Sequence, residues 1–145
     1  MNRNEISKMV EDSADRFGAR NPQQYKFLRL RLMKNSADEL GYGLLDLFFT
    51  APGDHRNIER QELAGRLLLE LSPQFEFDLK TTLRMVLPNY ELSVEQLPQY
   101  LVGIFGKDEV THVLQNMQGE TRDEQYLRNI QTMHFWIRGM SSSQG

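Results

Sequence analysis

His55 and Glu59 are the residues of this sequence best suited to chemistry, an imidazole and a carboxylate four positions apart. On a helix that spacing places both groups on one face, and Asp54 directly precedes the histidine. Together the three could hold a divalent ion or act as general acid and base. They define one candidate function, a hydrolase. The competing interpretation, which we adopt, places Asp54 and His55 in a solvated loop before a helix capped by Asn57.

Motifs of several well-known enzyme classes are missing from the sequence. Gly41-Tyr42-Gly43 lacks the third glycine of a dinucleotide-binding loop, and the chain has no phosphate-binding loop and no Gly-x-Ser-x-Gly motif. The absence of cysteine excludes thiol nucleophiles, zinc–thiolate sites and disulfide scaffolds. His112 and His134 fit a helix edge and an apolar helix face. We therefore predict a protein that is not an enzyme, with no catalytic residue, no metal site and no cofactor.

A basic window occupies the first quarter of the chain. Between Asp15 and Asp38 the sequence holds six cations and no acidic residue, with aromatic side chains interleaved. Such a segment could follow a phosphate backbone, which indicates an alternative function as a regulatory or nucleic-acid-associated adaptor. The formal net charge of −3 disfavours nucleic acid as the main partner. The window spans residues 16–34, and its candidate binding residues are Arg20, Lys26, Arg29, Arg31 and Lys34.

The last predicted helix carries two aromatic residues away from its apolar face. Phe135 and Trp136 lie outside the stripe that runs from Tyr126 to Ile137 at helical spacing. They need either a second packing layer or a partner, and tryptophan is enriched at binding hot spots. All of the net negative charge resides in residues 73–145. The predicted partner-binding residues are therefore two aromatic anchors and three acids that steer association: Phe135, Trp136, Glu120, Asp123 and Glu124.

These side chains must be positioned by helices, because apolar residues recur every three or four positions along most of the chain. Asn21-Pro22 predicts a helix start, and a hydroxyl followed three residues later by Glu or Gln predicts others. We expect Ser36, Ser93 and Thr121 each within two residues of a helix start. The sequence thus predicts an all-α domain of six to eight short helices, packed as antiparallel hairpins over residues 1–139, with a polar flexible tail at residues 140–145.

Two stretches alternate apolar and polar residues as a half-buried strand does, Phe27–Met33 and Phe75–Lys80. Two isolated strands form a poor sheet, so we retain the all-α prediction and place the start of a helix at Ser72-Pro73. Nine apolar residues at helical spacing are predicted to form the core: Leu63, Leu67, Leu71, Leu83, Leu101, Phe105, Leu114, Leu127 and Ile130.

Composition narrows the class of protein. The longest uncharged apolar run, residues 101–106, is far shorter than the ~20 residues of a membrane span, and the first ten residues show no signal-peptide core. We expect a cytoplasmic protein whose partner is another protein, with no membrane partner. Its predicted function is a non-enzymatic binding module, in its most concrete form a bacterial immunity- or antitoxin-like inhibitor that masks a toxin or effector. An acidic helical surface suits the masking of a basic active site.

Overall fold

The computed structural model describes residues 1–140, which form eight α-helices, one short 3₁₀ helix and no strand. Most of the chain is therefore helical, as the sequence predicts. None of these helices, within the described residues, is long and apolar enough to cross a membrane. In chain order the elements are α1 (Arg3–Phe17), α2 (Pro22–Leu32), α3 (Ala37–Phe49), α4 (Arg56–Leu71), α5 (Leu79–Val86), η1 (Leu87–Asn89), α6 (Gln96–Phe105), α7 (Lys107–Gln118) and α8 (Glu124–Arg138).

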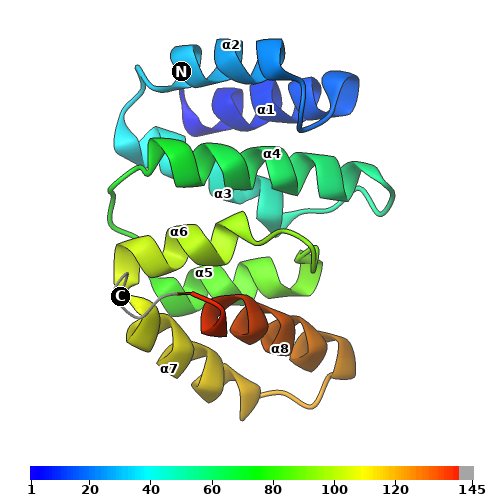
Figure 1. Ribbon diagram of the computed structural model, residues 1–145, viewed down its shortest axis with the longest axis vertical. Coiled ribbons are helices and arrows are strands. Elements are labelled where there is room, and N and C mark those ends of the chain that lie inside the picture. Colours follow the sequence, from blue (N-terminus) through cyan, green and yellow to red (C-terminus); the bar gives the residue numbers. More distant parts are fainter. Residues whose placement is uncertain (141–145) are drawn as a thin grey trace.

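The helices stack in two rows along the long axis of the molecule (Figure 1). In one row α1, α3, α5 and α7 contact each other in that order, and in the other row α4, α6 and α8 do so. α2 packs on α1 at one end of the stack, whereas α7 and α8 form the opposite end. The consecutive helices α1 and α2, α3 and α4, and α7 and α8 thus pair as hairpins that stack along the axis. The predicted single all-α domain of helical hairpins is confirmed.

Helix caps account for several of the helix starts. Asn21 accepts the backbone N–H of Gln24 and stands before Pro22, and Ser36 stands at the N-cap of α3, so both predicted starts are confirmed. The prediction is wrong for Ser93 and Thr121, each of which lies three residues before the first helical residue. At α8 the carboxylate of Asp123 occupies the cap, and the Thr121 hydroxyl instead accepts the Asp123 backbone N–H. A carboxylate competes well for this position because it also interacts with the helix dipole.

The two alternating stretches have different outcomes. The stretch Phe27–Met33 belongs to α2, which ends at Leu32, and Met33 is its C-cap. Residues 75–78, in contrast, belong to no helix or strand, and the prediction that a helix begins at Ser72-Pro73 is wrong, because α5 begins only at Leu79. Ser72 ends α4 in the left-handed conformation, and both rings of this segment turn inward. Phe75 packs edge-on against Tyr42 and stacks on Phe77.

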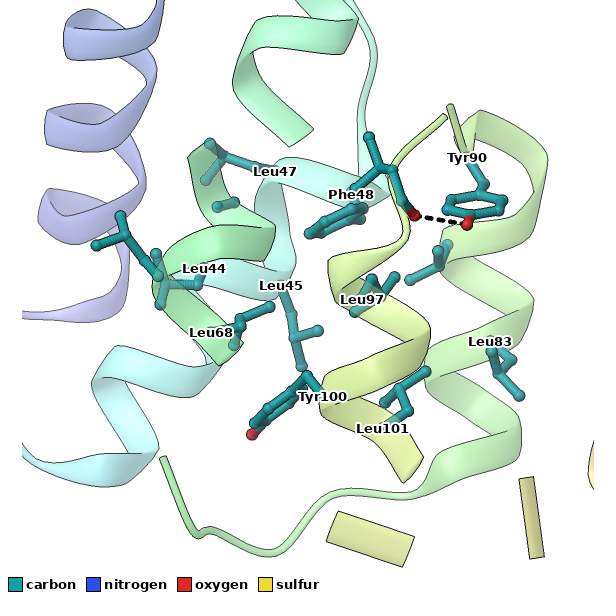
Figure 2. Close-up of a cluster of buried hydrophobic side chains, with 14 of the residues drawn as sticks. Leu44, Leu45, Leu47, Phe48, Leu68, Leu83, Tyr90, Leu97, Tyr100 and Leu101 are labelled. Carbon is teal, nitrogen blue, oxygen red and sulfur yellow. Dashed lines mark hydrogen bonds between the residues drawn. The ribbon is translucent and has the colours of Figure 1, made fainter. Parts of the chain in front are cut away.

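The core runs continuously through the stack. Six of the nine predicted core residues are buried, and the other three, Leu71, Phe105 and Leu127, are half-buried, so none of the nine is exposed. Figure 2 shows the central part of the core, in which side chains of α3 meet those of α4, α5 and α6. The residues labelled there are Leu44, Leu45, Leu47, Phe48, Leu68, Leu83, Tyr90, Leu97, Tyr100 and Leu101.

A buried amide connects the two rows near the middle of the stack. Gln61 of α4 is fully buried; its Nε2 donates to the Asn89 carbonyl at 2.7 Å, and its Oε1 accepts the Glu91 backbone N–H at 2.9 Å. The Asn89 side chain in turn donates to the carbonyl of Phe49 at 3.0 Å. These bonds fix the loop after η1 against α3 and α4, and so set the position of the four C-terminal helices relative to the first four.

Candidate functional site

Phe135 is the most exposed large apolar side chain among the described residues, with 61% of its surface accessible. Its neighbour Trp136 is half-buried, and the two rings meet edge-on with centroids 5.4 Å apart. The Trp136 indole N–H donates to the carbonyl of Leu92 at 3.0 Å, which fixes that ring to the loop before α6. Of the two predicted anchors, Phe135 therefore faces solvent while Trp136 supports it.

A groove of about 640 Å³ lies beside these rings, between the start of α6 and the end of α8. Its apolar surface comes from the two aromatic rings and Met140, while Glu95 and Arg138 supply opposite charges at its rim. An apolar centre with a polar rim is the usual anatomy of a protein–protein contact. We call this the α6–α8 groove; it is lined by Glu95, Gln99, Phe135, Trp136, Arg138, Gly139 and Met140.

A second hollow adjoins the α6–α8 groove, since Gln99 lines both. Leu69 of α4 lines this hollow with 41% of its surface exposed, and the buried Oε1 of Gln96 has no hydrogen-bond partner there. α6 is free of bulky side chains at Gly103, where a Cβ would meet no atom within 4 Å. The two hollows form what we call the even-helix face, which extends over α4, α6 and α8; its second hollow is lined by Tyr25, Arg66, Leu69, Glu70, Gln96 and Gln99.

The three predicted steering acids lie away from the aromatic anchor. Glu120 accepts hydrogen bonds from Lys80 at 2.6 Å and Arg84 at 3.3 Å, and the bond from Lys80 is the main reason that the pKa of Glu120 falls below its usual value. Asp123 caps α8 by accepting the N–H of Tyr126. Glu124 is exposed in the first turn of α8, about 16 Å along the helix axis from Phe135.

The structure therefore does not bring these acids and the anchor together. The α6–α8 groove has its own charged residues, Glu95 and Arg138. Sequence reasoning missed Glu95, Gln99 and Leu69. Leu69 could have been found, because it follows two leucines of the buried stripe and so points away from it.

The basic window is divided between two surroundings. Arg20 forms a two-pronged contact with Glu62 at 2.9 and 3.1 Å, and Arg29 lies 3.3 Å from Glu70, so α4 neutralises both. The remaining members are exposed. Within residues 1–140, four cations of the window form no ion pair: Arg16, Lys26, Arg31 and Lys34.

The hydrolase candidate residues each contact a different part of the protein. Asp54 binds Arg56 at 3.0 Å, and this hydrogen bond lowers the pKa of Asp54 to about 2. His55 is exposed just before α4, whereas Glu59 accepts the backbone N–H of Ala19 at 2.6 Å. No group of three His, Asp or Glu side chains within residues 1–140 is arranged to hold a metal ion.

The other two histidines occupy helix surfaces. His112 is exposed on α7, with its Nε2 3.4 Å from the side-chain amide of Asn116. His134 is half-buried on α8, where burial, and to a lesser extent the charge of Arg138, lowers its pKa.

The tail predicted at residues 140–145 lies outside the described residues except for Met140, which packs on the core. Comparison of the chain with protein-family models, with curated proteins and with solved structures finds no match.

Proposed function

We propose that this protein is a non-catalytic binding module that captures another protein on its even-helix face. The observation that carries the proposal is the exposed ring of Phe135 at the edge of the α6–α8 groove. A solvent-exposed aromatic ring held by a fixed neighbour loses little conformational freedom when it is covered, which makes it a good anchor. Trp136 provides that fixed neighbour through its bond to Leu92.

The polar residues of the face supply specificity. Glu95 and Arg138 offer one acceptor and one donor group in the α6–α8 groove, and Gln96 and Gln99 offer amides in the second hollow. A partner segment that crosses the face can bury Phe135 and Leu69 at two separate points while its polar groups bind between them. The charges of Arg20 and Arg29 are neutralised by α4, so the basic window does not form one continuous track for nucleic acid.

In its concrete form the proposal is an inhibitor of the immunity or antitoxin type, which covers a functional surface of its partner. The net charge of −3, concentrated in residues 73–145, supports a partner with a basic surface. Complementary charge speeds the encounter, and the apolar anchor then slows dissociation. Glu124, which is exposed, and Glu95, which is half-buried and lines the groove, are the acids of this half that we expect to contribute most to the association rate.

Affinity purification from the cells that naturally make the protein tests the proposal, with Phe135→Ala as the variant and Met85→Ala as the control. Met85 is also an exposed apolar residue, but it lies on α5, outside the even-helix face. We expect a partner to co-purify with the wild type and with Met85→Ala and to be lost with Phe135→Ala, because an anchor contributes about 2 kcal/mol or more. Equal recovery with a folded Phe135→Ala variant would contradict the proposal.

A further inference from the structure

The outer side of α2 is an apolar and basic helix face that no other part of residues 1–140 covers. Phe27 and Leu30 are 53% and 45% exposed, although Leu28 and Leu32 on the opposite side are fully buried. Arg31 shares the outer side, with its guanidinium 5.9 Å from the centre of the Phe27 ring. Phe27, Leu30 and Arg31 share one side of α2 because they are three or four positions apart, and Lys34, in the turn after α2, lines the same hollow. We call this set the α2 outer face: Phe27, Leu30, Arg31 and Lys34.

The position of α2 makes this exposure unusual. α2 is the end of a stack of helices, and the terminal helices of stacked-helix proteins normally present a polar outer side to solvent. At the other end α7 follows that rule. Its exposed residues are polar or charged: Asp108, Glu109, His112, Gln115, Asn116 and Gln118. α2 instead resembles an internal helix of the stack that lacks its next neighbour.

A groove between α1 and α2 extends the α2 outer face. Phe17 and Phe27 line it from the two helices, and Ser13 at its base has a buried hydroxyl oxygen without a hydrogen-bond partner. Acidic residues on the α1 side are already paired, since Asp12 lies 3.0 Å from Lys8 and Asp15 lies 2.7 Å from Arg60. The charge left to act on an incoming molecule is therefore positive.

The charges favour an acidic occupant over a second copy of the chain. No acidic residue occurs between Asp15 and Asp38, and four cations in that interval form no ion pair within the described residues. Two α2 outer faces packed on each other would bring Arg31 and Lys34 of both copies together, and such like charges repel. An acidic partner would instead pair with them.

We propose that the α2 outer face docks an acidic amphipathic helix of another protein, which packs on α2 as the next helix of the stack. The apolar stripe of the incoming helix covers Phe27 and Leu30, and its acidic residues pair with Arg31 and Lys34. This is recognition of a helix by a groove, with anchors at positions three or four apart. The surface is separate from the even-helix face and does not depend on Phe135.

A displayed library of random peptides tests the proposal. Peptides of about 16 residues, long enough for four helical turns, are selected on the full-length wild-type protein. Enriched peptides are then measured by fluorescence anisotropy against wild type, Phe27→Ala, Lys34→Glu and Phe135→Ala. Phe27 and Phe135 are both exposed phenylalanines, so each variant controls for the other. Thermal melts establish that all four proteins are folded.

The expected result is a set of acidic peptides with apolar residues three and four apart. We expect their affinity to fall about tenfold or more with Phe27→Ala and with Lys34→Glu, and to stay unchanged with Phe135→Ala. The emission of Trp136, the only tryptophan, should not shift on binding, because it lies at the far end of the stack in α8. Failure of this experiment would leave the role of Phe135 untouched.

Several outcomes would overturn the proposal. Enriched peptides without acidic residues, an absence of binders, or affinities unaffected by Phe27→Ala would show that the face does not select an acidic helix. Binding of the wild type to phosphatidylglycerol vesicles or to a single-stranded oligonucleotide through Phe27, in preference to the selected peptides, would assign the face to a different ligand. A dimer in light scattering that Phe27→Ala dissociates would assign it to a second copy.

Discussion

Gln61→Leu should destabilise the protein although it replaces a buried polar side chain by an apolar one of similar size. The Gln61 amide has no exposed surface; its nitrogen is hydrogen-bonded to the last residue of η1 and its oxygen to the loop that follows. Leucine can bind neither the carbonyl of Asn89 nor the N–H of Glu91. Both partly buried backbone groups would then lack the partner that the fold supplies.

The magnitude follows from those two bonds. A hydrogen bond contributes about 0.5–1.5 kcal/mol net, and a buried group left without a partner costs about 1–3 kcal/mol. Two such groups, partly offset by the favourable transfer of an apolar side chain into the core, give an expected loss of about 2–4 kcal/mol. The free energy of unfolding of a domain is typically about 5–15 kcal/mol, so the variant should fold but with a clearly lower urea midpoint.

Urea denaturation followed by far-UV circular dichroism measures this difference. Gln131→Leu is the matched control, because Gln131 is exposed on α8 and its replacement should change the free energy of unfolding by less than about 0.5 kcal/mol. Equal or greater stability of Gln61→Leu would contradict this prediction. It would mean that the loop after η1 is held by apolar packing alone and not by the amide.

Two further predictions concern packing and pH. Gly41→Ala should lower the free energy of unfolding by about 1–3 kcal/mol in denaturant melts, because the new Cβ would overlap the ring of Phe75. Gly103→Ala has open space at its Cβ and should raise the free energy of unfolding by about 0.5–1 kcal/mol through a more stable α6. Equal effects of the two variants would contradict the close approach of Phe75 to Gly41. His134 has a pKa below its unfolded value through burial, so its neutral form favours the folded state and stability falls as the pH drops below about 6.5. His134→Gln should therefore lose less stability than wild type between about pH 7.5 and pH 5.5; parallel losses would argue against this origin.

The sequence allowed prediction of those features that depend on local chemistry. Asn21 and Ser36 stand at helix starts because a cap contacts residues only three positions ahead. The position of Phe135 outside the apolar stripe followed from the geometry of a single helix, but whether other helices cover the ring did not, and the structure leaves it exposed. The alternation over Phe75–Lys80 did not decide between a strand and a helix, and residues 73–78 belong to neither. It could not show that the inward-facing rings pack on α3 and on each other instead of forming a sheet.

Features that depend on distant residues were beyond sequence reasoning. Trp136 is held by the carbonyl of Leu92, which lies 44 positions earlier in the chain. Arg20 is neutralised by Glu62 from a different helix, so a window that reads as uniformly basic is only partly so. Such pairings are set by how the hairpins stack, and the stacking depends on the packing of the whole core.

Site-specific photo-crosslinking can show whether the protein captures another protein on its even-helix face. A photoreactive p-benzoylphenylalanine replaces Phe135 or Leu69 on that face, or Met85 or Asn116 away from it, in cells that naturally make the protein. We expect positions 135 and 69 to yield an adduct with the same protein and positions 85 and 116 to yield none. Adducts at 85 or 116 in place of 135 and 69, or no protein adduct at either of those two face positions, would contradict it.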